Sequence, residues 1–313
     1  MRLLANGSAY GLVHNEFKAE FTGNRSYCSC QETAGHRDGG NCTSVFGHTC
    51  ELWSTGLAVS HDGGEHFELW GPPPTHLVAA LPTVYAKDQK LMGYGAVSPM
   101  MRGSDDAYYS LINLHGPDAG RCPFRASDIT NPSGFRGRGH SGAFDHRWRS
   151  PYLPGLPGGR CAKLTGSESQ GAPHTNVRRI VGGGQQKYIS LGGGGAGGIG
   201  YSFSEEPAYE KAMIGGFDSE RRGLVLEGLS RWGGKTVHSA YPSLLDHASP
   251  RLGRVLGDAG SVEDGDNYLL TDGAELFVYF GAAGDNILRH KLRFSSTPPA
   301  PAWVDQQSRH SMN

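Results

Sequence analysis

Two short polar segments carry side chains whose spacing could do chemistry. In HNEF, His14 and Glu16 stand two residues apart, and PHTNVRR places His174, Asn176 and Arg178 at the same spacing. If the segments are extended, side chains at i and i+2 point to the same face of the strand. A carboxylate beside an imidazole can transfer protons. A polar row would be costly against an apolar core, so we expect the second row to line a pocket.

The octapeptide SHDGGEHF, residues 60–67, concentrates a hydroxyl, a carboxylate and two glycines. The Ser60 hydroxyl and the Asp62 carboxylate can accept hydrogen bonds from backbone N–H groups of their own turn, and Gly64 can adopt a positive φ. We expect Phe67 to fold back into the packing between sheets. This segment is therefore predicted to close a hairpin, and Asp62 is not assigned to the site.

Most of the chain, including the segments that carry these residues, is predicted to form strands. The chain has 48 Gly and 18 Pro with only 19% charged residues, a composition typical of many turns and few exposed helices. Helical periodicity is confined to EEPAYEKAMIGG and YPSLLDHA. Short segments rich in aromatic and branched residues predict strands: YGLVHNEF, GLAVSHD, LMGYGAVS, AYYSLINLH, RCPFRASDI, KYISLGG, IGYSFSE, ELFVYFGA and ILRHKLRF.

A loose repeat suggests how the strands are grouped. A strand, a serine, a polar turn and an aromatic residue recur around Ser60, Ser127 and Ser204. The spacing approximates one four-stranded sheet with an inserted loop, and small sheets arranged radially form a β-propeller. We therefore expect an all-β fold: a single propeller domain over residues 1–313, with five blades, or else four or six, and a Cys-rich insertion at about residues 24–51.

The octapeptide resembles the Asp box, S-x-D-x-G-x-x-(W/F), of sialidases and other propellers. Further segments resemble blade motifs of propeller glycosidases: VHNEF, GYGAVS with YYSLIN, RASDITNPSGFRG, and YPSLLD with DNYLLTDGAELFVYF. The resemblance is to the superfamily of sialidases and five-bladed arabinanase and fructosidase relatives. It implies a glycoside hydrolase that acts on an oligosaccharide or polysaccharide.

The resemblance also implies where the catalytic groups lie. Glycoside hydrolysis uses two carboxyl groups, which in propellers project from innermost strands. Glu16 and Asp246 are the first candidates. Tyr241 could stack on a sugar or, with Glu227 adjacent, act as a sialidase-type nucleophile. His14 and the 174–178 row would bind substrate.

Three arginines, Arg102, Arg125 and Arg178, could form the carboxylate-binding set of sialidases. The sequence offers no sialidase-type Arg-Ile-Pro stretch near residue 1, so a neutral or differently charged glycan is expected equally. The alternative function is a non-catalytic propeller that binds a carbohydrate or a protein through the same face.

Four of the six cysteines, Cys28, Cys30, Cys42 and Cys50, stand close together. Two disulfides are expected there, pairing either 28–42 with 30–50 or 28–50 with 30–42. A zinc site that includes His36 and His48 is the alternative, although the C-x-C spacing is unlike zinc knuckles. Cys122 and Cys161 would pair with each other or remain reduced.

Other classes of ligand are disfavoured, and we expect no cofactor and no metal. A G-x-G-x-x-G pattern begins at Gly192, but IGYSFS alternates like a strand where a dinucleotide site needs a helix. The formal net charge of −1 lacks the basic excess of nucleic-acid binders. No apolar run is long enough to span a membrane. Sequons at Asn6, Asn24 and Asn41 and the even cysteine count favour an extracellular or secretory protein with a truncated or mature start, because no signal peptide is evident.

Overall fold

The computed structural model describes most of the first half of the chain and separate strands of the second half. The described residues are 2–4, 6–19, 26–28, 32–33, 36–37, 50–116, 119–145, 161–163, 176–181, 188–194, 198–215, 223–226, 243–246, 269–271, 275–282, 286–293 and 304–305. The chain forms two compact units. Unit 1 holds residues 8–97 and 110–168, and unit 2 holds residues 2–7, 98–109 and 169–313.

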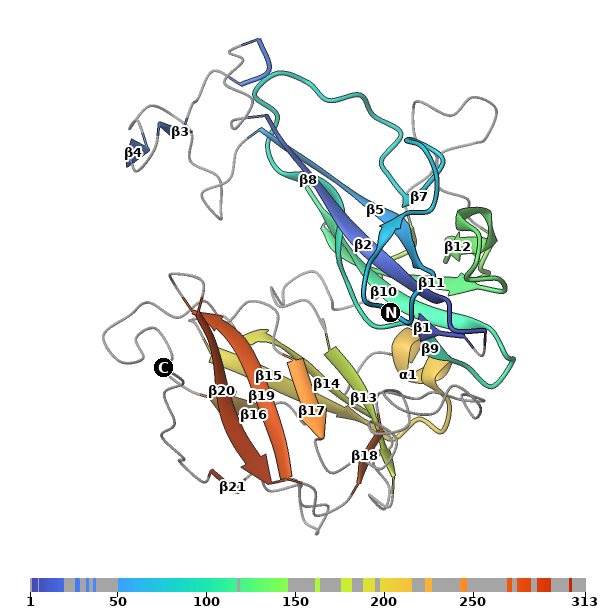
Figure 1. Cartoon of the computed structure of the whole chain (residues 1–313), viewed down its shortest axis with the longest axis vertical. Coiled ribbons are helices and arrows are strands. Elements are labelled where there is room, and N and C mark those ends of the chain that lie inside the picture. The colour runs from blue at the N-terminus through green and yellow to red at the C-terminus, as the bar shows by residue number, and fades with distance from the viewer. Residues whose placement is uncertain are drawn as a thin grey trace. The chain divides into compact units, whose positions relative to one another are not determined.

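Unit 1 is built on one mixed sheet with the strand order β2-β5-β8-β10-β11-β12 (Figure 1). These strands are β2 (Ala9–Lys18), β5 (Glu51–Ser60), β8 (Met92–Val97), β10 (Tyr108–His115), β11 (Gly120–Ala126) and β12 (Phe135–Gly137). Two short strands also pair with β5, namely β6 (Glu68–Leu69) and β7 (Leu77–Ala79). A 3-10 turn at Pro132–Gly134 precedes β12, and β3 (Glu32–Thr33) pairs with β4 (His36–Arg37).

The register of the sheet decides which side chains share a face. Strands β2 and β5 pair antiparallel from Ala9 opposite Ser60 to Lys18 opposite Glu51. Strand β5 runs parallel to β8, with Trp53 beside Gly93, and β10 pairs antiparallel to β8, with His115 beside the same Gly93. The apolar core of the unit contains the fully buried side chains Leu57, Tyr94, Ile112 and Phe124.

Unit 2 contains two further sheets. One is an antiparallel meander of β13 (Asn176–Val181), β14 (Tyr188–Gly194), β15 (Gly198–Ser204) and β16 (Gly223–Leu226), with β18 (Leu269–Thr271) parallel to β13. The other, also antiparallel, contains β17 (Ser243–Asp246), β19 (Glu275–Ala282), β20 (Asn286–Arg293) and β21 (Val304–Asp305). Short strands β1 (Arg2–Leu3) and β9 (Met101–Arg102) also belong to this unit, and β9 pairs with the first two residues of β10.

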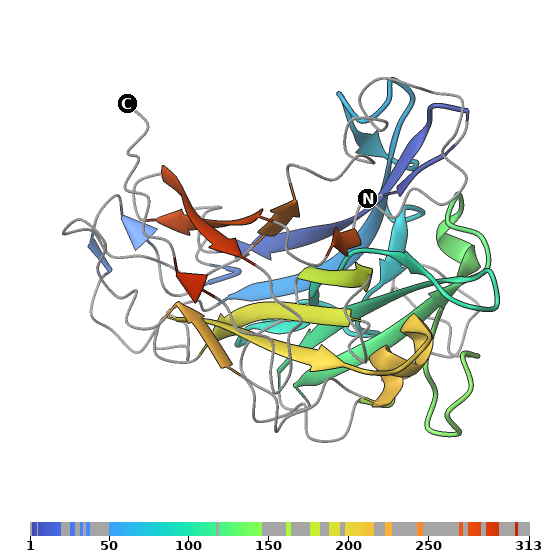
Figure 2. The same cartoon turned by 90° about the horizontal axis from the view of Figure 1, so that it is seen from below.

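Helix α1 (Tyr209–Gly215) is the one α-helix of the described residues. It follows β15 in the chain (Figure 2). Its Tyr209 ring lies 5.6 Å from the ring of Tyr188 on β14. Tyr209, Ala212 and Met213 are buried, so one side of this short helix covers the end of the meander. No helix of the described residues is long and apolar enough to cross a membrane.

The structure confirms the all-β class. Each of the nine segments predicted as strands contains one, and EEPAYEKAMIGG contains α1. The glycine-rich segment forms the β14–β15 hairpin, as the alternation in IGYSFS predicts. The helical reading of YPSLLDHA is wrong, because residues 243–246 form β17. Leucines favour helices locally, but here Leu245 pairs with Phe277 of β19, and tertiary pairing overrides that preference.

Candidate functional site

One face of the unit 1 sheet gathers polar and ionisable side chains from strands that are distant in sequence. We call it the polar face: it consists of His14, Glu16 and Lys18 on β2, Glu51, Trp53 and Thr55 on β5, Gly93 and Gly95 on β8, and Asn113 and His115 on β10. Alternation along each strand and the register between strands place all ten on the same side. The four strands lie side by side in Figure 1.

Two glycines leave the middle of this face open for rings from neighbouring strands. A methyl group at Gly95 would lie 2.7 Å from Trp53 Cε3 and 2.8 Å from His14 Cδ2. Gly93 has a φ of +122°, and a methyl group there would collide with the backbone of Trp53. Side chains at both positions are therefore excluded, and the neighbouring rings occupy the space above β8.

Three rings form a continuous row across the polar face. The Trp53 ring lies 4.3 Å from that of His14 and 4.5 Å from that of His115 between centroids, and both contacts are edge-on. His14 Nε2 and His115 Nε2 are buried, and neither makes a hydrogen bond to the described residues. These two nitrogens are thus held in a largely dry environment.

Burial sets the charge state of both imidazoles. It lowers the pKa of His14, an effect that Lys18 reinforces and Glu16 opposes. Burial and the nearby His14 lower the pKa of His115 to about 4. Both residues are accordingly neutral at pH 7, the form in which an imidazole can accept a proton.

Three charged side chains lie at the end of the polar face where β2 ends and β5 begins. Lys18 Nζ is 2.7 Å from Glu16 Oε2 and 3.9 Å from Glu51 Oε1. Glu51 is fully buried and its Oε2 accepts a hydrogen bond of 2.8 Å from Trp53 Nε1. The Glu16 side chain is 28% exposed, and its Oε1 lies 3.5 Å from His14 Nδ1. The arrangement offers one accessible carboxylate, flanked by an imidazole and an ammonium group.

The predicted residues of the N-terminal strand are brought together. His14 and Glu16 share a face of β2, as their spacing predicts. The other catalytic candidates belong to unit 2. Asp246 is the last residue of β17, and Glu227 and Tyr241 lie outside the described residues.

The remaining predicted binding residues lie on different strands of the two units. Asn176 and Arg178 are backbone positions of β13, and His174 lies outside the described residues. Arg102 is bound to Asp106 of its own turn at 3.0 Å, and half-buried Arg125 pairs with Arg136 across β11 and β12. Arg102 and Arg178 belong to unit 2 and Arg125 to unit 1.

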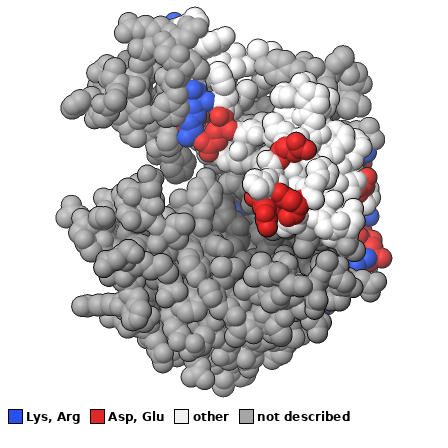
Figure 3. All heavy atoms as spheres, viewed as in Figure 1, with Lys and Arg blue, Asp and Glu red and all other residues white. Residues whose placement is uncertain are grey.

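The sequence reasoning missed Lys18, Glu51, Trp53 and His115. Lys18 continues the alternation of His14 and Glu16, and Glu51 and Trp53 alternate in ELWST in the same way, so a longer polar row could have been seen. His115 could not have been found, because its place depends on the parallel pairing of β5 with β8. On the face drawn in Figure 3, acidic residues of the described surface form several small groups, and basic residues lie beside one of these groups and along the right edge.

The octapeptide closes the β5–β6 hairpin, as predicted. Ser60 Oγ accepts a hydrogen bond from the Gly64 N–H at 2.8 Å, and Asp62 Oδ1 accepts those of Glu65 and His66 at 3.1 and 3.0 Å. Gly64 has a φ of +102°. The Ser60 hydroxyl also donates a hydrogen bond to Asp62 Oδ1 at 2.6 Å. This bond first, and then the bonds from His66, hold the pKa of Asp62 well below its usual range.

The expectation that Phe67 packs between sheets is wrong. Its residue is 43% exposed, because the short strand β6 begins immediately after it and leaves the ring on the surface. On the same turn, ligand atoms of Asp62, Glu65 and His66 lie within 4.8 Å of one another. All three are exposed, and the Asp62 carboxylate is already engaged by the turn, so this group carries no metal assignment.

The cysteine pairing is resolved in part. Cys28 bonds to Cys50 and Cys122 to Cys161. The first pair matches the 28–50 alternative and excludes pairing of 28 with 42; Cys30 and Cys42, like His48, lie outside the described residues. Oxidised sulfurs are not thiolate ligands, so the zinc alternative is wrong for Cys28 and Cys50, although Asp88 lies beside them.

Comparison with known proteins adds no family to this description. No family model matches the chain, and no curated protein matches it.

Proposed function

We propose that this protein binds an oligosaccharide or polysaccharide at the polar face and hydrolyses a glycosidic bond, with Glu16 as one of two catalytic carboxyl groups. The observation that carries the proposal is the accessible Glu16 carboxylate with His14 and Lys18 on either side, beside the Trp53 ring. Sugar sites combine carboxylates and hydrogen-bonding groups with aromatic surface.

The neighbours of Glu16 favour one of the two possible roles. A carboxylate ion-paired to an ammonium suits a nucleophile or base better than a proton donor. A second carboxyl group must then act as the acid or share the acid and base steps. Glu51 is close, since both carboxylates approach Lys18, but its complete burial keeps it from a substrate. The sequence-based candidates for this second carboxyl group, Asp246 and Glu227, belong to unit 2 and stay predictions.

We further propose a β-propeller architecture with five blades. Unit 2 supports it with two small sheets, because propeller blades are small antiparallel sheets. The four strands β17 and β19 to β21 pair antiparallel, and so do β13 to β16, which β18 extends in parallel. Ser60 ends β5, Ser204 ends β15, and Ser127 directly follows β11, so the loose repeat falls at equivalent strand ends. The Asp-box hairpin supports the same architecture. An experimental structure showing separate radial sheets would test it.

An extracellular or secretory location is part of the proposal. The two disulfides of the described residues support it, because such bonds persist in oxidising compartments. Mass spectrometry of the protein recovered from its native source would show intact disulfides and glycans on the sequons; free thiols throughout would contradict this location.

The test of the activity is a screen of the purified protein against polysaccharides and aryl glycosides, with products separated by chromatography. Wild type and Glu68→Gln should release the same sugar, and Glu16→Gln should not. Glu68 is a matched control, because its side chain is 72% exposed and lies on β6, outside the polar face. Release by Glu16→Gln at the wild-type rate would remove Glu16 from the mechanism.

A non-catalytic glycan-binding function is the second candidate. It is favoured by the burial of Glu51, which leaves Glu16 as the accessible carboxylate of the polar face. Calorimetry separates the two: binding of a polysaccharide without any product would support a binding protein, and product formation would exclude it.

A further inference from the structure

Glu51 is a fully buried carboxylate, although the polar face to which it belongs also carries the accessible carboxylate of Glu16. Burying a charge costs several kcal/mol unless it is paired and hydrogen-bonded, so Glu is almost never fully buried without partners. Two side-chain contacts of Glu51 are with other members of the polar face, Trp53 and Lys18. An apolar residue would fill the same volume without the desolvation cost.

The hydrogen bond to Glu51 fixes the tryptophan ring. With Nε1 held at 2.8 Å from Glu51 Oε2, the indole edge meets His14 on one side and His115 on the other. Gly93 and Gly95 provide the space that this placement requires. Without this acceptor, the partly buried N–H of Trp53 would lose its partner and the indole would gain freedom to rotate.

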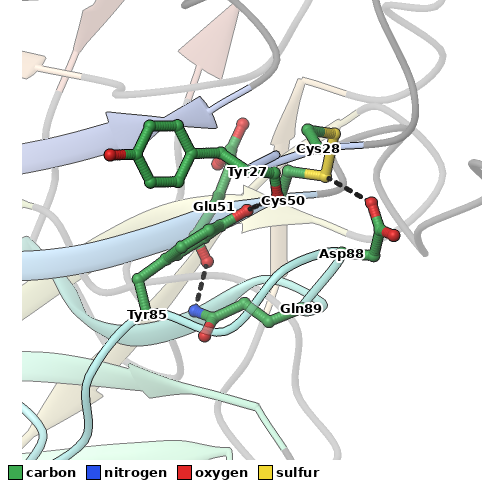
Figure 4. The surroundings of a disulfide bond; sticks show 7 residues. All are labelled: Tyr27, Cys28, Cys50, Glu51, Tyr85, Asp88 and Gln89. Carbon is green, nitrogen blue, oxygen red and sulfur yellow. Dashed lines mark hydrogen bonds between the residues drawn. A yellow bond between two sulfur atoms is a disulfide. The ribbon is translucent and has the colours of Figure 1, made fainter. Parts of the chain in front are cut away.

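The backbone around Glu51 is itself anchored (Figure 4). Cys50 is joined to Cys28 and its N–H donates to the Gln89 carbonyl at 2.8 Å. The Gln89 side chain donates to the Glu51 carbonyl at 3.1 Å. The start of β5 is thus tied to two other segments, which makes Glu51 a firm support rather than a mobile side chain.

We infer that Glu51 is a positioning residue of the site: its carboxylate holds the Trp53 indole between His14 and His115 and thereby keeps the imidazole beside Glu16 in a dry environment. Glu51 does not touch substrate in this scheme. The inference rests on the proposed function in one respect, namely that Glu16 is the catalytic carboxylate. The packing of Glu51, Trp53 and the two histidines can be tested without any substrate.

The test compares Glu51→Ala with Glu51→Gln by NMR titration of the two histidines. Glutamine keeps an oxygen that can accept the Trp53 N–H, and loss of the negative charge alone should leave the pKa values of His14 and His115 unchanged or lower. Alanine also frees the indole, so both pKa values should rise towards 6.5 as water reaches the rings. A residue that only stabilised the fold would not produce this difference in sign.

A folded Glu51→Ala protein whose histidines titrate as in wild type would overturn the inference, and so would shifts of the same sign in both variants. If Glu51→Ala does not fold, Trp53→Phe provides the second variant, because it keeps the Glu51 charge and removes the N–H donor. It should raise both pKa values, and unchanged values would equally overturn the inference. A wild type that hydrolyses no glycan would refute the proposed function and leave these titrations valid.

Discussion

Adding one methyl group at Gly95 tests the close packing of the polar face most simply. The new Cβ would meet Trp53 Cε3 at 2.7 Å and the His14 ring even closer, where real contacts need more than 3 Å. Neither ring can move freely, because Trp53 is bonded to Glu51 and lies edge-on to both imidazoles. Gly95→Ala should therefore force the rings or the strand to shift.

Overpacking of this kind costs about 1–3 kcal/mol. For a unit of this size, a loss of about 2 kcal/mol corresponds to a melting temperature lower by about 4–8 °C. The matched control is Gly120→Ala on β11, whose Cβ would meet the flexible side chain of Lys163. Moving that side chain aside gives up the 3.3 Å hydrogen bond from Lys163 Nζ to the Ala119 carbonyl, which is exposed, so we expect a smaller loss of about 0.5–1 kcal/mol.

Thermal unfolding followed by circular dichroism, at a pH where the histidines are neutral, measures both variants. We expect a clear loss for Gly95→Ala, together with altered NMR shifts of the His14 ring. If Gly95→Ala melts with wild type or with Gly120→Ala, the rings do not fill the space above β8 as described.

Three further changes test neighbouring features. Below pH 6.5 the unfolded chain protonates His115, but the folded chain does not until about pH 4, so the free energy of unfolding should fall by about 3 kcal/mol across that interval. Denaturation at several pH values should show this loss in wild type and a smaller loss in His115→Gln. An equal dependence of stability on pH in both proteins would contradict the lowered pKa of His115. Lys18→Met removes a charge that lowers the pKa of His14, so NMR titration should give a higher pKa; a lower one would show that Lys18 lies elsewhere. Ser60→Ala removes the acceptor of the Gly64 N–H, and urea denaturation should report a loss of about 1 kcal/mol; unchanged stability would mean that the turn does not depend on this hydroxyl.

The strands were predictable from sequence because they depend on local alternation and turn residues. The hairpin at residues 60–67 was predictable for the same reason, since its hydrogen bonds join residues within four positions of one another. The exposure of Phe67 and the strand at 243–246 were not, because each depends on what lies opposite in space. Local patterns do not contain that information.

The residues of the polar face likewise fall into those that a local pattern predicts and those that it does not. His14 and Glu16 are two residues apart on one strand, so the sequence alone predicts that they share a face. Trp53 and Glu51 reach them through the β2–β5 register, and His115 through the parallel β5–β8 pairing. Register across strands from separate parts of the chain is fixed by packing of the whole face, so a single sequence does not reveal it.

The proposed cleavage of glycans at the polar face depends on the Glu16 carboxylate. Its most direct test is kcat/KM for wild type, Glu16→Gln and Glu68→Gln on the best substrate found in the screen. We predict that Glu16→Gln falls by about 10²–10⁴-fold, the range typical of a lost acid, base or nucleophile, while Glu68→Gln matches wild type. A Glu16→Gln protein within about threefold of wild type would lie inside the range of ordinary surface changes and would contradict the claim.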